Sequence, residues 1–530
     1  MGTYLNPGNS GFTRIKSRQY IDKTGLIGVL NRTINTTDNL VCVSRPRRFG
    51  KSYAAQMLCA YYDKSCRSDE LFAGCEITKD PTYPEHLNKY DVIYLDMTNL
   101  LGKTSPDQLI EYIQKQVIQE IRSVYPDAQS ADALDETLIN ATLHTGNKFI
   151  ALIDEWDAPI RETPEIEEEY LRFLRMLFKG SGTTARIFAA AYMTGILPIK
   201  KDGSQSAISD FHEYTMLAPG EFGRFIGFTE AEVRSICEEG GLSFENMRAW
   251  YDGYSAGTER SIYNPYSVMM AAKDKAFRSY WKKTSAAEAL KTYIDMDEDG
   301  LQDVIARLIA GESAEVDTDA FQNDLTTFTS RDDVLTLMIH LGYLAYEEDR
   351  DAYGEDGGDT PAGFVRIPNR EVRLEFGNIL RKAKHKELIQ LVRDSDQLLK
   401  DTLEGREEAV AGAFSRIRET EYAPAYYNNE QALRYIIKFA YISSVDQYAR
   451  LEELPTGRGL ADIVFVPKKR SVLPAMIIEL KWSKSAEGAI NQIYEKKYPS
   501  ALKGYGGSIV LVGINYDQKT KEHSCRIETV

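Results

Sequence analysis

Residues 45–52 (RPRRFGKS) place a glycine, a lysine and a serine at the spacing that holds nucleotide phosphates. The loop follows the apolar run LVCV and precedes the helix-forming run SYAAQMLCAYY, which is the strand–loop–helix setting of the pattern GxxxxGK[ST]. Gly50, Lys51 and Ser52 fit, whereas Arg45 occupies the place of the first glycine. We expect Lys51 to reach the β- and γ-phosphates and Ser52 to hold Mg²⁺. The alternative is a basic turn before a helix.

A second apolar run, in KFIALIDEWD, leads into the acidic pair Asp154 and Glu155 at a predicted strand end. Asp154 would hold the Mg²⁺ of a nucleotide, directly or through water, and Glu155 would polarise the attacking water. Asp157 is either a further carboxylate of the site or a cap for the following turn, and the cap is favoured. Thr194 ends the run FAAAYMTG and either senses the γ-phosphate or belongs to an ordinary turn.

These motifs together predict a site for ATP and Mg²⁺, with Ser52 and Asp154 as metal ligands and Glu155 as the catalytic residue. The predicted nucleotide-binding residues are Arg45, Pro46, Arg47, Arg48, Phe49, Gly50, Lys51, Ser52, Asp154 and Thr194.

Near the C-terminus, ADIVFVP and AMIIELKW are predicted to form an antiparallel hairpin. Glu479 and Lys481 are two residues apart on the second strand, so both side chains point to one face, and the hairpin can bring Asp462 to the same end. Two carboxylates at one place repel unless a cation lies between them, so we expect Mg²⁺ bound by Asp462 and Glu479. Lys481 would orient or deprotonate a water and stabilise the transition state. The alternative is a surface ion pair.

The elements that must position these residues alternate along residues 10–215. Short apolar runs at 38–44, 91–97, 148–154 and 185–195 alternate with amphipathic stretches such as SPDQLIEYIQKQVIQEIRSVY. Strands alternating with helices predict an α/β fold with a parallel sheet covered on both faces.

The pattern beyond this region becomes helical from about residue 225 to 345, starting with a capping box at Thr229 and Glu232. The acidic, glycine-rich segment 346–360 is predicted to be a solvated hairpin tip rather than an ion site. Helical pattern resumes over residues 374–421, and the last segment suggests helix, strand, strand, helix, strand. The predicted domains are residues 1–225, 226–415 and 416–530.

Composition narrows the class of protein. The net charge of −15 argues against a general nucleic-acid coat, but residues 416–530 contain 17 Lys and Arg against 13 Asp and Glu. This basic tail suits a polyanionic ligand or reflects chance variation between domains. No run approaches the roughly 18 apolar residues of a membrane span, and six scattered cysteines without a CxxC pair argue against zinc. We expect reduced thiols and a cytoplasmic protein without a membrane partner.

Several strings beyond the two acidic motifs are distinctive. They are YIDKTGLI (20–27), IDEWDAPI, MTGILPI, WYDGY (250–254), IYNPYSV (262–268) and IPNREV (367–372). With RPRRFGKS, the first five of these strings resemble the AAA-ATPase-like family of prokaryotic proteins, over roughly residues 8–270. IPNREV also recurs in such proteins and marks the middle region. The resemblance implies an ASCE-type P-loop ATPase core with a helical lid, in which arginine in place of the first glycine is normal. It also implies a C-terminal PD-(D/E)xK nuclease-like domain of restriction-endonuclease-like fold.

That nuclease resemblance adds accessory residues. Gln492 matches the helical glutamine often found beside the metal in this superfamily, and Glu430 is a candidate for an extra helical carboxylate. Arg458 is a candidate phosphate contact or a turn residue. The predicted catalytic set of this domain is Asp462, Glu479 and Lys481.

The predicted function is ATP binding and hydrolysis coupled to Mg²⁺-dependent cleavage of nucleic acid. The alternative is a non-catalytic, nucleotide-dependent switch whose nuclease-like domain only binds nucleic acid or a protein partner. Homo-oligomer formation is left open, with Arg161, Arg186 and Arg224 as equal candidates for an arginine finger. A metabolic kinase is disfavoured because no acceptor site is evident.

Overall fold

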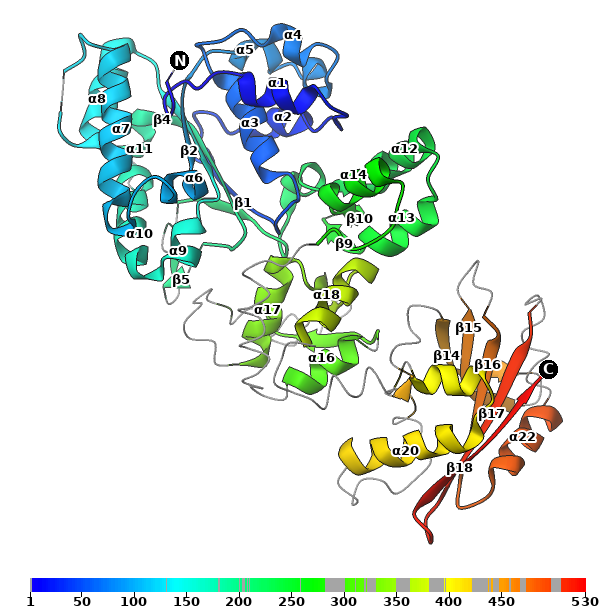
Figure 1. Ribbon diagram of the computed structural model, residues 1–530. Helices are drawn as coiled ribbons and strands as arrows, with labels where there is room; N and C mark the ends of the chain where they lie inside the picture. The colour runs from blue at the N-terminus through cyan, green and yellow to red at the C-terminus, as the bar shows by residue number, and fades with distance from the viewer. Residues whose placement is uncertain are drawn as a thin grey trace, which may run out of the picture. The chain divides into compact units, whose positions relative to one another are not determined.

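The structure is a computed structural model of the chain (Figure 1). It describes residues 2–129, 131–179, 182–199, 201–202, 205–206, 208, 210–257, 259–281, 301–309, 311–318, 321, 330–348, 363–380, 395, 397–421, 437, 440–441, 448–456, 459–467, 473–496 and 507–530. The chain forms two compact units, one of Met1–Ala286 with Glu315–Val372 and one of Ala287–Ala314 with Arg373–Val530. The middle region predicted over residues 226–415 therefore contributes to both.

The first unit is built on a five-stranded sheet in the order β2-β3-β4-β1-β7, in which each of the four strand pairs is parallel. The predicted α/β fold with a parallel sheet is confirmed, and each of the four predicted strands is present. Sequence analysis missed the short edge strand β7. The strands are β1 (Leu40–Ser44), β2 (Asp91–Asp96), β3 (Phe149–Asp154), β4 (Phe188–Gly195) and β7 (His212–Tyr214).

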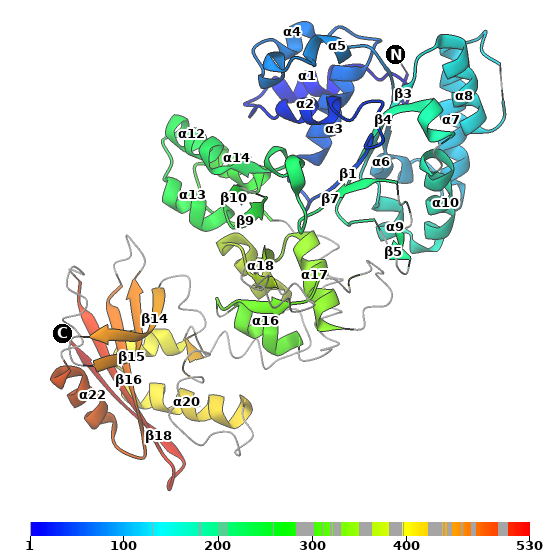
Figure 2. The same ribbon diagram turned by 180° about the vertical axis from the view of Figure 1, so that it is seen from behind.

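Helices cover both faces of this sheet. α7, α8, α10 and α11 lie on one side and α1, α2 and α3 on the other (Figures 1 and 2). The helices are α1 (Ser10–Lys16), α2 (Gly25–Asn31), α3 (Lys51–Tyr62), α4 (Asp69–Phe72), α5 (Tyr83–His86), α6 (Met97–Leu101), α7 (Leu109–Val124), α8 (Leu134–Thr145), α9 (Ala158–Glu162), α10 (Glu167–Phe178) and α11 (Thr184–Ile187). Shorter elements are η1 (Glu76–Lys79), η2 (Pro106–Gln108), η3 (Pro164–Ile166), β5 (Lys201–Asp202), β6 (Gln205–Ser206) and η4 (Gly220–Phe225).

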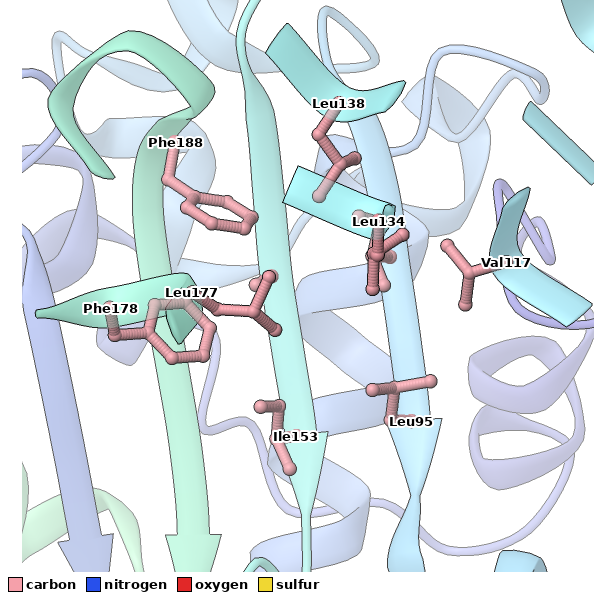
Figure 3. A pocket seen from close by; sticks show the side chains of 10 residues that line it. Leu95, Val117, Leu134, Leu138, Ile153, Leu177, Phe178 and Phe188 are labelled. Carbon is pink, nitrogen blue, oxygen red and sulfur yellow. The ribbon is translucent and has the colours of Figure 1, made fainter. Parts of the chain in front are cut away.

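The core between the sheet and α7 follows directly from the sequence. Leu109, Ile113, Val117 and Ile121 recur at helical spacing and are buried on one face of α7. They pack with buried side chains of β2, β3, α8 and α10 in one apolar cluster. A void of about 10 Å³ lies between these side chains (Figure 3), and it holds one water at most. It is a packing defect of the core rather than a ligand site.

The predicted helical lid is only partly helical. A three-stranded sheet, β8-β10-β9, lies among its helices, which corrects the prediction. The strands of this sheet were not predicted because they are too short to show a clear alternation of apolar and polar residues. The predicted capping box is confirmed, because the amide of Thr229 donates to Glu232 Oε2 at 2.7 Å. The elements are β8 (Phe228–Thr229), α12 (Glu230–Gly240), α13 (Phe244–Tyr251), β9 (Tyr254–Ala256), β10 (Glu259–Tyr263) and α14 (Pro265–Asp274).

The hairpin predicted around the acidic segment is also present. β12 (Ala345–Glu348) pairs antiparallel with β13 (Gly363–Arg366), and its tip lies outside the described residues. β13 also pairs with β11 (Ala314–Val316). Helices α16 (Leu301–Ile309), α17 (Arg331–Leu341) and α18 (Arg370–Leu380) accompany them in the chain.

The second unit contains a mixed five-stranded sheet in the order β14-β15-β16-β17-β18. Side chains of β15, β16 and β17 alternate between a cluster with α20 and a cluster with α22, so the two helices cover opposite faces. The prediction of three strands for this segment was too few, because β14 and β18 were missed. The elements are α20 (Glu407–Glu421), β14 (Tyr448–Thr456), β15 (Gly459–Pro467), β16 (Ala475–Trp482), α22 (Ala486–Glu495), β17 (Ile509–Asp517) and β18 (Glu522–Thr529).

Within the described part of the chain, no helix is both long enough and apolar enough to cross a bilayer.

Candidate nucleotide site and candidate nuclease site

The loop from β1 to α3 leaves an uncapped helix start. Gly50 precedes α3 with a φ of 96°, in the left-handed region that glycine adopts without strain. No side chain caps the first amides of α3, which begins at Lys51. Free amides at a helix start attract an anion. The backbone therefore suits a phosphate group.

Lys51 is buried at the base of this loop. Its side chain is 3% exposed, and its Nζ lies 3.3 Å from Glu155 Oε1. The same Nζ donates to the carbonyl of Pro46 at 3.2 Å. Ser52, the next residue, is exposed at the helix start. The predicted lysine and the predicted acidic pair are thus brought together.

Asp154 ends β3 and is 2% exposed. Its Oδ1 accepts from Thr194 Oγ1 at 3.1 Å, and its Oδ2 accepts from Tyr94 OH at 3.4 Å. Burial raises the pKa of Asp154 to about 6, against the lowering effects of the Ser52 hydroxyl and the Lys51 ammonium. A buried carboxylate beside a hydroxyl suits a divalent cation. Sequence analysis missed Tyr94, whose proximity depends on β2 lying next to β3.

Arg45 has a different place from the one predicted. Its side chain is buried, with Nη1 donating to the carbonyls of Ser44 at 2.8 Å and Tyr214 at 3.2 Å. These partners lie on β1 and on the edge strand β7. The guanidinium therefore braces the sheet, and a role for this side chain in phosphate binding is not supported.

The prediction for Asp157 also needs correction. The residue occupies the cap position of α9 but makes no side-chain cap hydrogen bond. Its Oδ2 instead accepts from the amides of Ile196 at 3.2 Å and Leu197 at 3.0 Å and pairs with Arg161 at 2.8 Å. The carboxylate of Asp157 binds amides that lie about 40 residues away in the chain, and the local sequence does not reveal such partners.

The second site lies on the hairpin of β15 and β16. The register pairs Ile463 with Ile478, and Asp462 Oδ2 accepts from the amide of Leu480 at 2.9 Å. Asp462 and Glu479 therefore share one end of the hairpin, as predicted from the twofold alternation. Glu479 is 2% exposed, and burial together with the Asp462 charge raises its pKa to about 7.

Two more predicted residues converge on Glu479. Lys481 Nζ donates to Glu479 Oε1 at 3.1 Å, and Gln492 of α22 donates to the same oxygen. Glu479 Oε2 is buried and has no hydrogen-bond partner among the described residues. A buried, unpartnered carboxylate oxygen beside a second carboxylate suits a cation. Glu430 and Arg458 lie outside the described residues.

Over the described residues, no group of three or more His, Cys, Asp or Glu side chains is placed to hold a metal. Each of the two candidate cation sites has two protein ligands instead. They are Asp154 with the Ser52 hydroxyl at the first site and Asp462 with Glu479 at the second.

Two family models match the chain. Residues 8–204 match the predicted AAA-ATPase family, and residues 428–524 match the PD-(D/E)XK nuclease superfamily. The protein carries an AAA-ATPase-like domain and a nuclease-superfamily domain. The predicted resemblance to the AAA-ATPase-like family is confirmed over residues 8–204, and the predicted nuclease-like domain is confirmed over residues 428–524. The strings WYDGY, IYNPYSV and IPNREV lie outside the matched residues.

Individual relatives add little. A protein of Azotobacter chroococcum mcd 1, described as an uncharacterized protein in the vnfD 5′ region, is 23% identical over 528 residues, or 95% of this chain and 93% of that one. The Aeropyrum pernix ORC1 protein in complex with DNA is 10% identical with a TM-score of 0.24, covering 72% of this chain and 98% of that chain. The A. pernix ORC2 protein (ADPNP-ADP complexes) is 12% identical with a TM-score of 0.25, covering 68% and 93%. At these scores the structural likeness carries no argument.

The loop of residues 45–50, the candidate phosphate loop, packs against the lid. The rings of Phe49 and Tyr254 meet edge to face with centroids 5.3 Å apart, and Tyr254 OH donates to the carbonyl of Gly342 at 2.6 Å. Arg48 donates to the carbonyl of Tyr280 and stacks on Tyr266, 4.6 Å from the ring centroid. The side of the loop that faces the lid is therefore held by three separate segments.

Two of the strings singled out in the sequence, WYDGY and IPNREV, meet in one hydrogen-bonded cluster. Asn369 Nδ2 donates to the carbonyl of Asp252 at 2.7 Å, and Asn369 Oδ1 accepts from the amide of Val372 at 3.0 Å. Arg366 donates to the carbonyl of Gly253 at 3.1 Å. The strings WYDGY and IPNREV thus act together, although more than a hundred residues separate them.

Glu371 joins the third string to this cluster. Its Oε2 accepts from Ser267 of the string IYNPYSV at 2.8 Å. Its Oε1 accepts from the amides of Tyr280 at 2.6 Å and Trp281 at 3.1 Å. Because Arg48 donates to the carbonyl of Tyr280, a single backbone residue connects the phosphate loop with Glu371.

Gly253→Ala should lower the free energy of unfolding of the first compact unit by about 2–4 kcal/mol. Gly253 has a φ of 116°, and a Cβ there would overlap the backbone carbonyl of Pro368. Gly257→Ala is the matched control, because its φ of 63° is also positive but its nearest neighbour, the Gly220 carbonyl, lies 3.8 Å away. Denaturant unfolding of both variants measures the difference, and equal losses would refute the clash.

Stability should fall as pH rises through the titration of Glu371. Burial raises its pKa from 4.5 to about 7, so between these values the folded chain keeps a proton that the unfolded chain has lost. The stabilising contribution is present below about pH 4.5 and is lost by about pH 7, at a cost of about 3 kcal/mol. Glu371→Gln should flatten this dependence, since its amide can still accept from both backbone amides and donate to Ser267. Thermal unfolding at pH 5.5 and 8.5 tests this, and an unchanged pH slope would contradict it.

Proposed function

We propose that the AAA-ATPase-like domain binds and hydrolyses ATP with Mg²⁺. The observation that carries this proposal is the meeting of Lys51, Asp154, Glu155 and Thr194 at the start of α3. A buried ammonium, an uncapped helix start and two acidic groups at one strand end are the parts that phosphoryl transfer to water requires.

The roles of these residues follow from their contacts. Lys51 and the first amides of α3 bind the β- and γ-phosphates, and Ser52 with Asp154 would hold Mg²⁺, which neutralises charge on the phosphates. Glu155 orients the attacking water and draws off its proton. Thr194, which donates a hydrogen bond to Asp154, would respond to the γ-phosphate through the metal ligand.

We further propose that the nuclease-superfamily domain cleaves nucleic acid. The unpartnered Oε2 of Glu479, buried beside Asp462 and Lys481, carries this proposal. Asp462 and Glu479 would hold Mg²⁺, which would supply positive charge to the scissile phosphate. Lys481 orients a water for attack and stabilises charge in the transition state, and Gln492 fixes the orientation of Glu479.

Coupling between the two activities is the third part of the proposal. The phosphate loop contacts Tyr280 through Arg48, and Tyr280 contacts Glu371 at the beginning of α18. Helix α18 runs from the first compact unit into residues of the second. A change at the phosphates can therefore reach α18 through hydrogen bonds, and the chain of α18 continues into the second unit.

Purified protein incubated with Mg²⁺, with and without ATP, and with single- and double-stranded DNA and RNA tests both activities. Phosphate release and nucleic-acid cleavage are the expected results, the first lost in Lys51→Ala and the second in Glu479→Gln. Nucleic-acid binding without cleavage by the wild-type protein would instead support a non-catalytic, nucleotide-dependent switch.

A further inference from the structure

Glu155 is held between two cations. Its Oε1 lies 3.3 Å from Lys51 Nζ and its Oε2 lies 3.0 Å from Arg161 Nη2. Its backbone has a φ of 52°, a conformation that non-glycine residues rarely adopt. Such a conformation persists where the surroundings fix it, and it is common at functional sites.

Arg161 connects this carboxylate to the end of the neighbouring strand. Its Nε lies 2.8 Å from Asp157 Oδ2, and that oxygen also accepts from the amides of Ile196 and Leu197. These two amides follow β4, the strand that carries Thr194. Arg161 therefore ties the turn that holds Glu155 to the turn that follows Thr194.

The burial of Arg161 decides between two uses of this arginine. An arginine finger must project from its own chain into a neighbour's site. The Arg161 side chain is only 11% exposed and is paired with two carboxylates of its own chain. Arg224, by comparison, is 57% exposed and lies 3.8 Å from Glu76. Arg161 is built into its own site.

We propose that Arg161 is the positioning residue for Glu155 within the same chain. The inference rests on the ATP hydrolysis proposed above. Nucleotide phosphates compete with Glu155 for Lys51, because both need the same ammonium. When the phosphates take Lys51, Arg161 keeps hold of the other oxygen of Glu155 and so keeps the carboxylate aimed at the attacking water.

The first test is steady-state ATP hydrolysis by Arg161→Ala and Arg161→Lys. A misplaced Glu155 should lower kcat by about a hundredfold in Arg161→Ala with KM little changed. Arg161→Lys should recover part of kcat, since an ammonium can pair with one carboxylate but cannot bridge two. Arg172→Ala, at an exposed position of the neighbouring helix α10, is the matched control and should hydrolyse ATP at the wild-type rate.

A double-mutant cycle separates positioning from a structural role. In a Glu155→Gln background, Arg161→Ala should cause no further loss of kcat, because both residues act through one group. If the loss of kcat in the double variant equalled the product of the two single-variant losses, the proposal would be overturned.

Arg161→Ala removes the cation that pairs with the buried Asp157 carboxylate, which keeps only its two backbone amide donors. The double variant Arg161→Ala with Asp157→Asn is therefore measured beside it, with thermal unfolding as the check on folding. The proposal would also be overturned if the folded Arg161→Ala variant, or the folded double variant Arg161→Ala with Asp157→Asn, hydrolysed ATP with the wild-type kcat.

Mixing variants tests the finger directly. Lys51→Ala protein keeps Arg161 but cannot turn over ATP, so an intermolecular finger would restore activity to Arg161→Ala protein. We expect the mixture to show only the sum of the separate rates, and recovery beyond that sum would overturn the proposal. Failure of the proposed ATPase function looks different: wild-type protein would release no phosphate, or Glu155→Gln would leave its rate unchanged.

Discussion

Glu479→Gln should reduce Mg²⁺-dependent cleavage of nucleic acid by about a thousandfold or more. Cation binding at a phosphoryl site supplies several kcal/mol of transition-state stabilisation, and about 4 kcal/mol corresponds to a thousandfold in rate. Glutamine keeps the volume of the side chain and an oxygen for Lys481 and Gln492, so the fold should survive. Cleavage of labelled DNA and RNA with Mg²⁺ measures the effect.

A binding measurement makes this prediction independent of activity. Mg²⁺ held by Asp462 and Glu479 in the folded domain would raise the thermal unfolding midpoint of the wild-type protein, and Glu479→Gln should lose this increase. Glu487→Gln, at an exposed position in the first turn of α22, is the matched control for removing one acidic charge nearby. Undiminished cleavage by Glu479→Gln would show that the metal site lies elsewhere.

The parts of these sites that sequence could predict are those set by short-range periodicity. Glu479 and Lys481 share a face because strand side chains alternate, and a hairpin brings Asp462 to them. The buried run before Asp154 places that residue at a strand end, and in a parallel sheet the strand ends meet at one edge. Gly50, Lys51 and Ser52 need only the strand–loop–helix order that the hydrophobic pattern supplies.

What sequence could not predict depends on contacts between distant segments. Tyr94 reaches Asp154 only because β2 lies beside β3, and Arg45 is buried only because β7 adds to the sheet edge. The local sequence favoured a helix-capping role for Asp157, whereas its side chain accepts hydrogen bonds from the two amides that follow β4. Strand β14 contains Pro455, which is tolerated because β14 is an edge strand. Strand β18 is mostly polar because it forms the other edge.

Lys51→Ala should reduce ATP turnover by about a thousandfold. Lys51 is the buried cation of the phosphate loop, and no other lysine contacts Glu155 among the described residues. The fold should persist, because Glu155 keeps its pair with Arg161. Wild-type protein at ATP concentrations of about a hundred times Kd gains about 2.7 kcal/mol in the free energy of unfolding, and the variant should gain none. Lys115→Ala, at an exposed position on α7, is the control that should behave as wild type.

The same variant tests whether ATP governs the nuclease domain. Arg48 links the phosphate loop to Tyr280, and Glu371 links Tyr280 to the start of α18, so the occupied and empty phosphate sites should bias the lid differently. In the wild-type protein the cleavage rate should change when ATP is added, and in Lys51→Ala it should not. Arg48→Ala should weaken this response more than it weakens ATP binding, because Arg48 contacts Tyr280 and Tyr266 of the lid whereas Lys51 is the main ligand expected for the phosphates. Equal cleavage with and without ATP in the wild-type protein would mean that the two domains work independently on one chain.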